Sequence, residues 1–248
     1  MIVDRAEHSV YTSNSYLLAD GPDGSGVLVD GHGQGRALLD RIERDRISIE
    51  EILLTHHHGD HVEVREYLDR FDVPVLAHPR TAELVEGLVT DTLEDGDEVI
   101  AGDLVVRALF TPGHAAGHLA LLANDTDLLT GDLLFKGTVA GTMASGATGF
   151  SDLRESIMER LMTLDGSVRV HPGHTLPTTI EDEWRSNPFI RIWRGLDPEG
   201  SERCRVRGRE ATLVLWAPDY DGTNKAWVRF GDSEDQIVGG SQVERLGP

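Results

Sequence analysis

Residues 51–61 read EILLTHHHGDH, a short apolar run that ends in a dense cluster of imidazoles and one carboxylate. The apolar part is typical of a strand that is covered on both faces. The pattern His56-x-His58-x-Asp60-His61 then places three imidazoles and a carboxylate within one tight turn, a donor mixture that borderline metal ions such as zinc favour. Because four donors so close in sequence reach a single ion only with strain, the spacing favours two ions.

Three other predicted strand ends present side chains that can bind a metal. Thr-Pro-Gly precedes His114, and Gly113 allows the sharp corner that would turn this imidazole inward. Leu-Leu-Thr-Gly precedes Asp132, and Val-His-Pro-Gly precedes His174. Each of these corners is a weak signal alone. Together with the cluster at residues 56–61 they predict one metal centre that is assembled from four strand ends.

Apolar periodicity predicts a mixed α/β chain in which strands and helices alternate. A turn sequence between Asn14–Ala19 and Val27–Asp30 predicts a hairpin. Leu38, Leu39 and Ile42 are spaced as one face of a surface helix. The other expected helices are a short one that closes at 68–72 and those at 81–88 and 151–165. The other expected strands are at 73–77, 104–110, 119–123, 127–129, 168–170, 211–216, 225–230 and 236–238.

The composition changes near residue 197, where Asp-Pro-Glu-Gly-Ser-Glu is typical of a linker. We therefore predict a main domain over residues 1–196 and a small β-rich module over residues 203–248, similar to an SH3-like barrel. A module of this size buries little core of its own. We expect it to lean on the main domain or on a second subunit, so a homodimer is one possible assembly.

Charge and hydropathy exclude several classes of partner. The net charge of −20 opposes binding to nucleic acid and to anionic membranes, whose phosphates attract Lys and Arg. No apolar run approaches the roughly 18 residues that cross a bilayer, and the first residues lack the apolar core of a signal peptide. A cytoplasmic protein is therefore expected. The single cysteine, Cys204, excludes an intrachain disulfide and a thiolate-built metal cluster.

The ordered histidine and aspartate motifs resemble the metallo-β-lactamase superfamily. Within it the chain is most similar to the glyoxalase-II-like (hydroxyacylglutathione hydrolase-like) branch, because Leu134-Phe135 follows Asp132 and because of the stretch 178–189. The resemblance covers roughly residues 10–192. It implies a four-layer α/β/β/α sandwich, which periodicity alone does not specify.

The same resemblance implies a ligand set. One ion would be held by His56, His58 and His114, and a second by Asp60, His61 and His174, with Asp132 as the bridge between them. Two divalent ions are expected; the donors suit zinc, and similar sites tolerate iron or manganese. His118 is expected to orient one of the ligands from behind.

A dinuclear site of this kind implies hydrolysis of a small molecule. A hydroxide shared by the two ions would attack an activated carbonyl, such as a thioester or lactone. Asp60 is the expected catalytic residue, orienting the hydroxide or relaying its proton. Lys136 and Thr142 lie on the predicted substrate loop. Thr142 stands where relatives carry an arginine, and the β-rich tail differs from a helical tripeptide-binding domain, so glutathione is not favoured as the substrate.

The sequence is also compatible with three alternative functions. A mononuclear-iron oxidoreductase similar to persulfide dioxygenases would share the histidine scaffold but bind one iron. A binding or regulatory module would use the metal structurally, although structural sites are usually closed and this one leaves positions open. An RNA-processing nuclease would need an inserted domain that this chain lacks and a less acidic surface.

Overall fold

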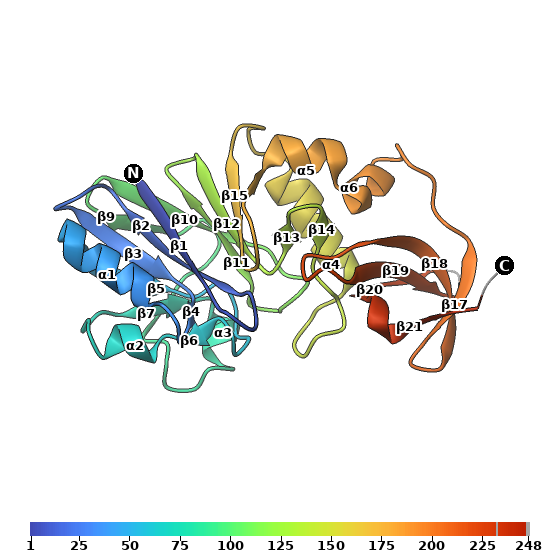
Figure 1. Cartoon of the computed structure of the whole chain (residues 1–248), viewed down its shortest axis with the longest axis horizontal. Coiled ribbons are helices and arrows are strands. Elements are labelled where there is room, and N and C mark those ends of the chain that lie inside the picture. Colours follow the sequence, from blue (N-terminus) through green and yellow to red (C-terminus); the bar gives the residue numbers. More distant parts are fainter. Residues whose placement is uncertain (232, 247–248) are drawn as a thin grey trace.

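The computed structural model describes residues 1–231 and 233–246 and places two six-stranded sheets face to face, with a third sheet at the C-terminal end (Figure 1). Asp232, Gly247 and Pro248 of the predicted second module lie outside the described residues. No helix among the described residues has both the length and the apolar character needed to cross a membrane.

The first sheet has the strand order β1-β2-β3-β5-β7-β8. The predicted hairpin is confirmed as β2 and β3, while β5 runs parallel to both of its neighbours, β3 and β7. The strands are β1 (Ile2–Glu7), β2 (Asn14–Ala19), β3 (Ser25–Val29), β5 (Ser48–Leu53), β7 (Val75–Ala77) and β8 (Asp91–Thr92), with a short pair formed by β4 (Gly31–His32) and β6 (Val62–Glu63) beside it.

The second sheet has the order β16-β15-β12-β11-β10-β9. Its strands β12 and β15 are parallel, and its other neighbouring strands are antiparallel. They are β9 (Glu98–Ala101), β10 (Leu104–Phe110), β11 (Leu119–Ala123), β12 (Asp127–Gly131), β15 (Arg169–Pro172) and β16 (Thr178–Thr179), and β13 (Leu134–Phe135) pairs with β14 (Thr138–Val139) in a separate hairpin.

Alternation along the strands divides the core into layers. In β2, Tyr16 and Leu18 face the second sheet, whereas Leu17 and Ala19 face the helices outside. In the second sheet Leu129 points into the space between the sheets and Leu128 points outward. Successive side chains of a strand point to opposite faces, so both faces of each sheet are buried. The predicted α/β sandwich, with helices outside two stacked sheets, is confirmed.

The helices cover the two outer faces (Figure 1). α1 (Arg36–Asp45) and α2 (Arg65–Leu68) pack on the first sheet, and Leu38, Leu39 and Ile42 form the buried face that their spacing predicts. The other helices are α3 (Pro79–Ala82), α4 (Phe150–Glu155), α5 (Ile180–Ser186) and α6 (Pro188–Trp193), of which the last three cover the second sheet.

Two predicted helices differ from the structure. The helix expected over residues 81–88 is only the four-residue α3 followed by turns, because Leu84 on its apolar face is 56% exposed and no packing sustains a longer helix. The helix expected over residues 151–165 begins at Phe150 and continues as the π-helical stretch η1 (Ser156–Leu161). Its predicted face of Leu153, Ile157 and Leu161 is nevertheless fully buried.

The C-terminal residues form a five-stranded antiparallel sheet with the order β20-β19-β18-β17-β21. Among the described residues no pairing joins β20 to β21, so the closed SH3-like barrel expected from the sequence is not found. The elements are β17 (Glu202–Val206), β18 (Arg209–Pro218), β19 (Asn224–Phe230), β20 (Glu234–Gly239), the 3-10 turn η2 (Gly240–Gln242) and β21 (Val243–Arg245).

One face of this C-terminal sheet packs on the main domain. Trp227 and Ile237 are buried in the same apolar cluster as Phe189 of α6 and Leu153 of α4. Thr142, in the loop after β14, adds a polar connection, since Ile237 donates its N–H to the Thr142 hydroxyl and accepts from the Thr142 N–H. The division into residues 1–196 and 203–248 stays a prediction, but the two parts share one core.

The parallel pair β12 and β15 is held together at its start by a buried carboxylate. Asp127 accepts hydrogen bonds from Arg169 Nε at 2.7 Å, Arg169 Nη2 at 2.6 Å and His171 Nε2 at 2.8 Å. Burial alone would raise the pKa of Asp127, but the hydrogen bonds from His171 and Arg169 hold this pKa well below its usual range. The pairing matters for function because both strands lead directly into predicted ligands.

We expect Asp127→Asn to lower the free energy of unfolding at pH 7 by about 1–3 kcal/mol, the usual worth of hydrogen bonds to a charged group. A carboxyl whose pKa is depressed by folding stabilises the fold above its unfolded pKa of about 3.9 and loses that effect as the pH falls. Urea unfolding of both proteins between about pH 7 and pH 3 should therefore show a shrinking difference. The exposed Asp125→Asn should change stability by less than about 1 kcal/mol, and a difference independent of pH would contradict the assignment.

The shared core predicts that the C-terminal sheet and the main domain unfold together. Ile237→Ala should lower the free energy of unfolding by about 2–4 kcal/mol, as for other buried Ile truncations, in a single transition by fluorescence and circular dichroism. Ile100, which is 66% exposed, supplies the matched control, and Ile100→Ala should have almost no effect. Two separate transitions in the variant would show that the parts are independent.

Candidate metal centre

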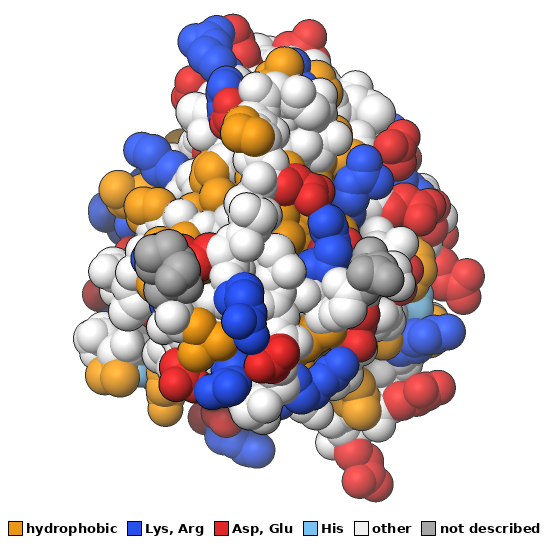
Figure 2. Space-filling model, turned by 90° about the vertical axis from the view of Figure 1, so that its right-hand side faces the viewer, with side chains coloured by type: hydrophobic (Ala, Val, Ile, Leu, Met, Phe, Trp, Pro, Cys, Tyr) orange, Lys and Arg blue, Asp and Glu red, His pale blue; other side chains and the backbone are white. Residues whose placement is uncertain are grey.

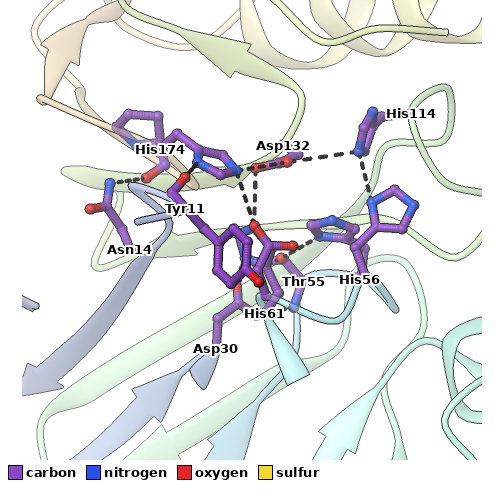
Figure 3. Close-up of polar contacts among 12 residues, drawn as sticks. Tyr11, Asn14, Asp30, Thr55, His56, His61, His114, Asp132 and His174 are labelled. Atoms are coloured by element: carbon purple, nitrogen blue, oxygen red, sulfur yellow. Dashed lines mark hydrogen bonds and ion pairs between the residues drawn. The ribbon is translucent and has the colours of Figure 1, made fainter. Parts of the chain in front are cut away.

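The predicted ligands come together at one end of the sandwich, where four strands finish (Figure 3). β5 leads into the cluster at residues 56–61, and β10, β12 and β15 lead into His114, Asp132 and His174. β10 and β12 are both antiparallel to β11, and β15 is parallel to β12, so these three strands end at the same edge. Buried strands therefore deliver side chains from distant parts of the chain to a single place.

The ligand atoms form two triads. In the first triad, one nitrogen each of His56, His58 and His114 lies within 4.8 Å of the other two. In the second, one ligand atom each of Asp60, His61 and His174 lies within the same distance of the other two. In the first triad His114 Nε2 is 3.0 Å from His58 Nδ1. In the second, Asp60 Oδ2 is 3.8 Å from His61 Nε2 and 3.6 Å from His174 Nε2.

Asp132 lies between the two triads. Its carboxylate oxygens are 3.2 Å from His174 Nε2, 3.4 Å from His61 Nε2 and 3.7 Å from His114 Nε2. One carboxylate thus faces imidazoles of both groups. The structure brings the predicted ligands together, and their division between two ions stays a prediction.

Hydrogen bonds on the outer side of the rings orient several of the imidazoles. His114 Nδ1 and His174 Nδ1 each donate to a backbone carbonyl at 3.0 Å, that of Gly141 and that of Tyr11 respectively. His58 Nε2 lies 3.2 Å from the carbonyl oxygen of Ser145. Since a carbonyl oxygen only accepts, each of these bonds fixes the ring proton outside and leaves the lone pair of the other nitrogen facing inward.

The inward atoms fit a pair of cations. His56 Nε2, His61 Nε2 and Asp132 Oδ1 are buried and have no hydrogen-bond partner among the described residues. Buried polar atoms are nearly always paired, so unpaired atoms that converge call for an occupant. The lone pairs of His58 Nδ1 and His114 Nε2 also face each other at 3.0 Å, which is repulsive unless a cation or proton lies between them.

Electrostatics within the cluster follow from burial and from Asp132. Burial lowers the pKa of His114 to about 4 and holds the pKa of His56 well below its usual value, so both rings are neutral. Burial would also lower the pKa of His61 and of His174, but the Asp132 carboxylate raises both. Burial would raise the pKa of Asp132, and His174 and His61 lower it well below the usual range. Cations that bind here must displace the protons.

The sequence reasoning missed Asp30, which lies directly after β3 and connects two parts of the site. Its carboxylate accepts from the Thr55 N–H and hydroxyl at 2.7 Å each, and it is 2.9 Å from His61 Nδ1 (Figure 3). Thr55 Oγ1 in turn lies 3.0 Å from His56 Nδ1. An acidic residue at the end of a predicted strand was the available signal, because Asp132 occupies the same kind of position.

Asn14 and Tyr16 were also missed, and they fix the loop that carries His174. Asn14 Nδ2 and the Tyr16 hydroxyl both donate to the carbonyl of Pro172, at 2.9 Å and 2.7 Å. The loop must also pass close to Asp132, because a Cβ on Gly173 would lie 2.2 Å from Asp132 Oδ1. A glycine at this corner is therefore required by space.

Two other histidines lie near the cluster without joining either triad. His118 is fully buried beside His56, but its hydrogen bond goes to the Thr111 hydroxyl, so orientation of a ligand by His118 stays a prediction. Burial lowers the pKa of His118 to about 3. His57 is half-buried and packs against Gly146 of the loop after β14.

The predicted substrate-loop residues Lys136 and Thr142 are not brought to the cavity. Lys136 is exposed at the turn between β13 and β14, and Thr142 is buried by its bonds to β20, where its hydroxyl also donates to Gln236 Oε1 at 2.7 Å. Their neighbours do reach the site. Gly141 and Met143 line a cavity of about 350 Å³ that opens beside His114 and Asp132.

The comparisons with known proteins agree with this geometry. The model of the metallo-β-lactamase superfamily matches residues 8–174. The chain therefore belongs to the metallo-β-lactamase superfamily. It is 32% identical to the probable metallo-hydrolase YqgX of Bacillus subtilis over 200 residues, which are 72% of this chain and 92% of that protein.

Solved structures show the same fold. The structure of ETHE1 from Myxococcus xanthus matches with a TM-score of 0.69 and 27% identity, covering 79% of this chain and 92% of that one. The structure of TTHA1623 in a di-iron-bound form matches with a TM-score of 0.65 and 32% identity, covering 75% of this chain and all of that one. About a quarter of this chain therefore has no counterpart in the second structure.

We expect Asp30→Asn to weaken metal binding by about 10- to 100-fold, as for other groups that orient a metal-bound imidazole. Asp30 has a backbone φ of +55°, and asparagine tolerates this left-handed conformation as well as aspartate does, so the change tests the carboxylate. Zinc affinity would be measured by competition with a chromogenic chelator. Asp40→Asn on the exposed face of α1 is the control, and equal affinity of both variants would contradict the role of Asp30.

Proposed function

We propose that this chain is a dinuclear metal-dependent hydrolase that cleaves an activated carbonyl, such as a thioester or lactone, of a small molecule. The proposal depends on one observation: two donor triads, buried or partly buried, lie on either side of a shared carboxylate and beside a cavity of about 350 Å³. A cavity of this volume suits a small-molecule ligand. The description of YqgX as a probable metallo-hydrolase and the di-iron form of TTHA1623 support the proposal.

The donor atoms assign a place to each ion. One ion would be held by His56 Nε2, His58 Nδ1 and His114 Nε2. The other ion would be held by the inward atoms of Asp60, His61 and His174, and Asp132 would contact both ions. Five imidazoles and two carboxylates suit zinc, and iron or manganese are also compatible. When bound, such a pair supplies a water that ionises near neutral pH and a Lewis acid for the carbonyl oxygen.

The residues of the chain orient the imidazole rings, supply a proton acceptor and line the cavity with apolar side chains. Asp60 Oδ2 is part of the second triad, and its carboxylate, only partly buried, can accept the proton of the attacking water and return it to the leaving group. The outer hydrogen bonds of His58, His114 and His174 keep the rings from turning. Phe135, Met143 and Ile237 give the cavity an apolar lining.

The finer assignment to the glyoxalase-II-like branch is part of the proposal. Its support is the hairpin of β13 and β14 after Asp132, which the stretch 178–189 fixes through Glu183. Glu183 is buried, accepts from the Gly137 N–H at 2.9 Å and is bonded to Thr178 and Asn187. Glutathione itself is not proposed as the substrate, since a β-sheet occupies the C-terminal part of the chain.

A second candidate is the mononuclear-iron oxidoreductase similar to persulfide dioxygenases. The similarity to the ETHE1 structure favours it, and the first triad alone could hold one iron. The second triad favours the dinuclear site, because Asp60, His61 and His174 also bring one donor atom each within 4.8 Å of one another, and His61 Nε2 has no hydrogen-bond partner among the described residues.

Metal analysis and a substrate screen test the proposal. The purified chain loaded with zinc should bind about two equivalents and hydrolyse at least one member of a panel of thioesters, lactones and β-lactams. Asp60→Asn should reduce kcat by about 100-fold or more, as for loss of a general base. His57→Gln changes a neighbouring imidazole outside both triads and is the matched control, with activity close to wild type.

Two results would overturn this assignment. One equivalent of iron with oxygen uptake would favour the oxidoreductase, and a protein unable to bind any metal would exclude both candidates. Full activity of Asp60→Asn would leave the metal centre in place but remove the proposed role of this carboxylate.

A further inference from the structure

The cavity beside the metal centre has two walls from different parts of the chain. His114, Asp132 and the loop containing Gly141 and Met143 form one of them. The C-terminal sheet forms the other with Arg207, Tyr220, Lys225, Ile237, Val238, Gly239 and Gln242. The family match ends at residue 174, so this second wall lies outside the region that the chain shares with the superfamily model.

Tyr220 connects the second wall directly to the metal centre. This residue lies in the turn after β18, and its ring stacks on the His174 ring with centroids 4.8 Å apart and planes 18° from parallel. It also packs on Phe135 at 4.7 Å. A molecule in the cavity therefore contacts the C-terminal sheet and the metal centre together.

Most cations of the C-terminal sheet are already neutralised. The end of the molecule that this sheet forms carries basic and acidic side chains side by side (Figure 2). The ion pairs are Arg203 and Arg205 with Glu210, Arg209 with Glu234, Arg229 with Glu199 and Asp235, and Arg245 with Glu202. Lys225, which lines the cavity, is paired with Asp219 at 2.9 Å.

Arg207 differs from these residues. Within the part of the chain that the structure describes it has no acidic partner, and its side chain bonds only to a neutral amide, from Nη2 to Gln242 Oε1 at 3.1 Å. Arg207 has a φ of +50° and Gly208 a φ of +80°, in the two-residue turn between β17 and β18. Asn, Asp or Gly usually occupy such a position, so the arginine is kept at a conformational cost.

We propose that Arg207 binds a carboxylate at the far end of the substrate, so that the enzyme selects anionic acyl compounds. This inference rests on the proposed hydrolase function. A guanidinium offers a fork of N–H donors that matches a carboxylate. One free guanidinium balances a single negative charge, whereas a phosphate dianion in a chain of net charge −20, with Lys225 already paired, would stay uncompensated.

The reaction that follows is the hydrolysis of a dicarboxylic acid monothioester or a similar ester. Water adds to the thioester carbonyl, the C–S bond breaks, and the products are a dicarboxylate and a thiol. The distal carboxylate takes no part in bond making and stays on Arg207, while the reacting carbonyl lies at the metal centre. Arg207 is thus a specificity-determining residue and not a catalytic one.

Two matched thioesters of N-acetylcysteamine test this selectivity. The glutaryl and valeryl thioesters have the same chain length and differ in the terminal carboxylate. We expect wild type to prefer the glutaryl compound by about tenfold or more in kcat/KM, and Arg207→Asn to remove this preference. Asparagine suits the left-handed turn and removes the charge. Arg203→Asn, in the same sheet and paired with Glu210, is the control and should keep the wild-type preference.

A binding measurement separates this inference from the proposed chemistry. Glutaramate and valeramide are the corresponding amides, and their affinities for the zinc-loaded protein would be measured by calorimetry. We expect glutaramate to bind about tenfold more tightly to wild type and Arg203→Asn but not to Arg207→Asn. Tighter binding of glutaramate without turnover of either thioester would support Arg207 and refute the hydrolase. Hydrolysis without any carboxylate preference, or a preference that persists in Arg207→Asn, would overturn the role of Arg207.

Discussion

The contact between Asp132 and three imidazoles requires strands from distant parts of the chain to end at the same place. A buried carboxylate is costly unless charges or hydrogen bonds compensate it, and here the compensation comes from His61 and His174, while His114 lies 3.7 Å away. These four residues belong to distant segments that meet only because their strands end at the same edge. The sandwich can therefore be seen as the scaffold that brings one carboxylate and its partners into contact.

Several polar side chains around the metal centre help to hold these strand ends together. Asp30 joins the ends of β3 and β5 through Thr55 and His61, Asn14 and Tyr16 hold the carbonyl of Pro172, and Asp127 holds β12 against β15. Each is a buried polar group that forms hydrogen bonds between strands. Polar networks of this kind specify a geometry more strictly than apolar packing does, since a displaced partner leaves a buried group unpaired.

The C-terminal sheet forms one wall of the cavity beside the metal centre. Its inner face completes the apolar core beside α4 and α6, while its turns bring Tyr220 and Arg207 to the opening beside the metal centre. The metal-binding donors come from the region that matches the superfamily model, and much of the cavity wall comes from residues beyond that match. Under the proposed function, the reaction and its selectivity would depend on different parts of one chain.

Local sequence determined the donor types, the buried strands and the alternation that builds the sandwich. The spacing within residues 56–61 and the strand-end glycines predicted seven metal-binding side chains at strand ends, because that placement follows from local geometry. Their meeting at one place depends on the order and direction of the strands in the two sheets. The short α3, the open C-terminal sheet, the contacts of Asp30 and the position of Arg207 were decided only by the tertiary structure. Their behaviour depends on contacts between residues far apart in sequence: Leu84 has nothing to pack against, β20 and β21 do not pair among the described residues, Asp30 meets His61, and the Arg207 turn faces the cavity. A local pattern carries no information about such long-range partners.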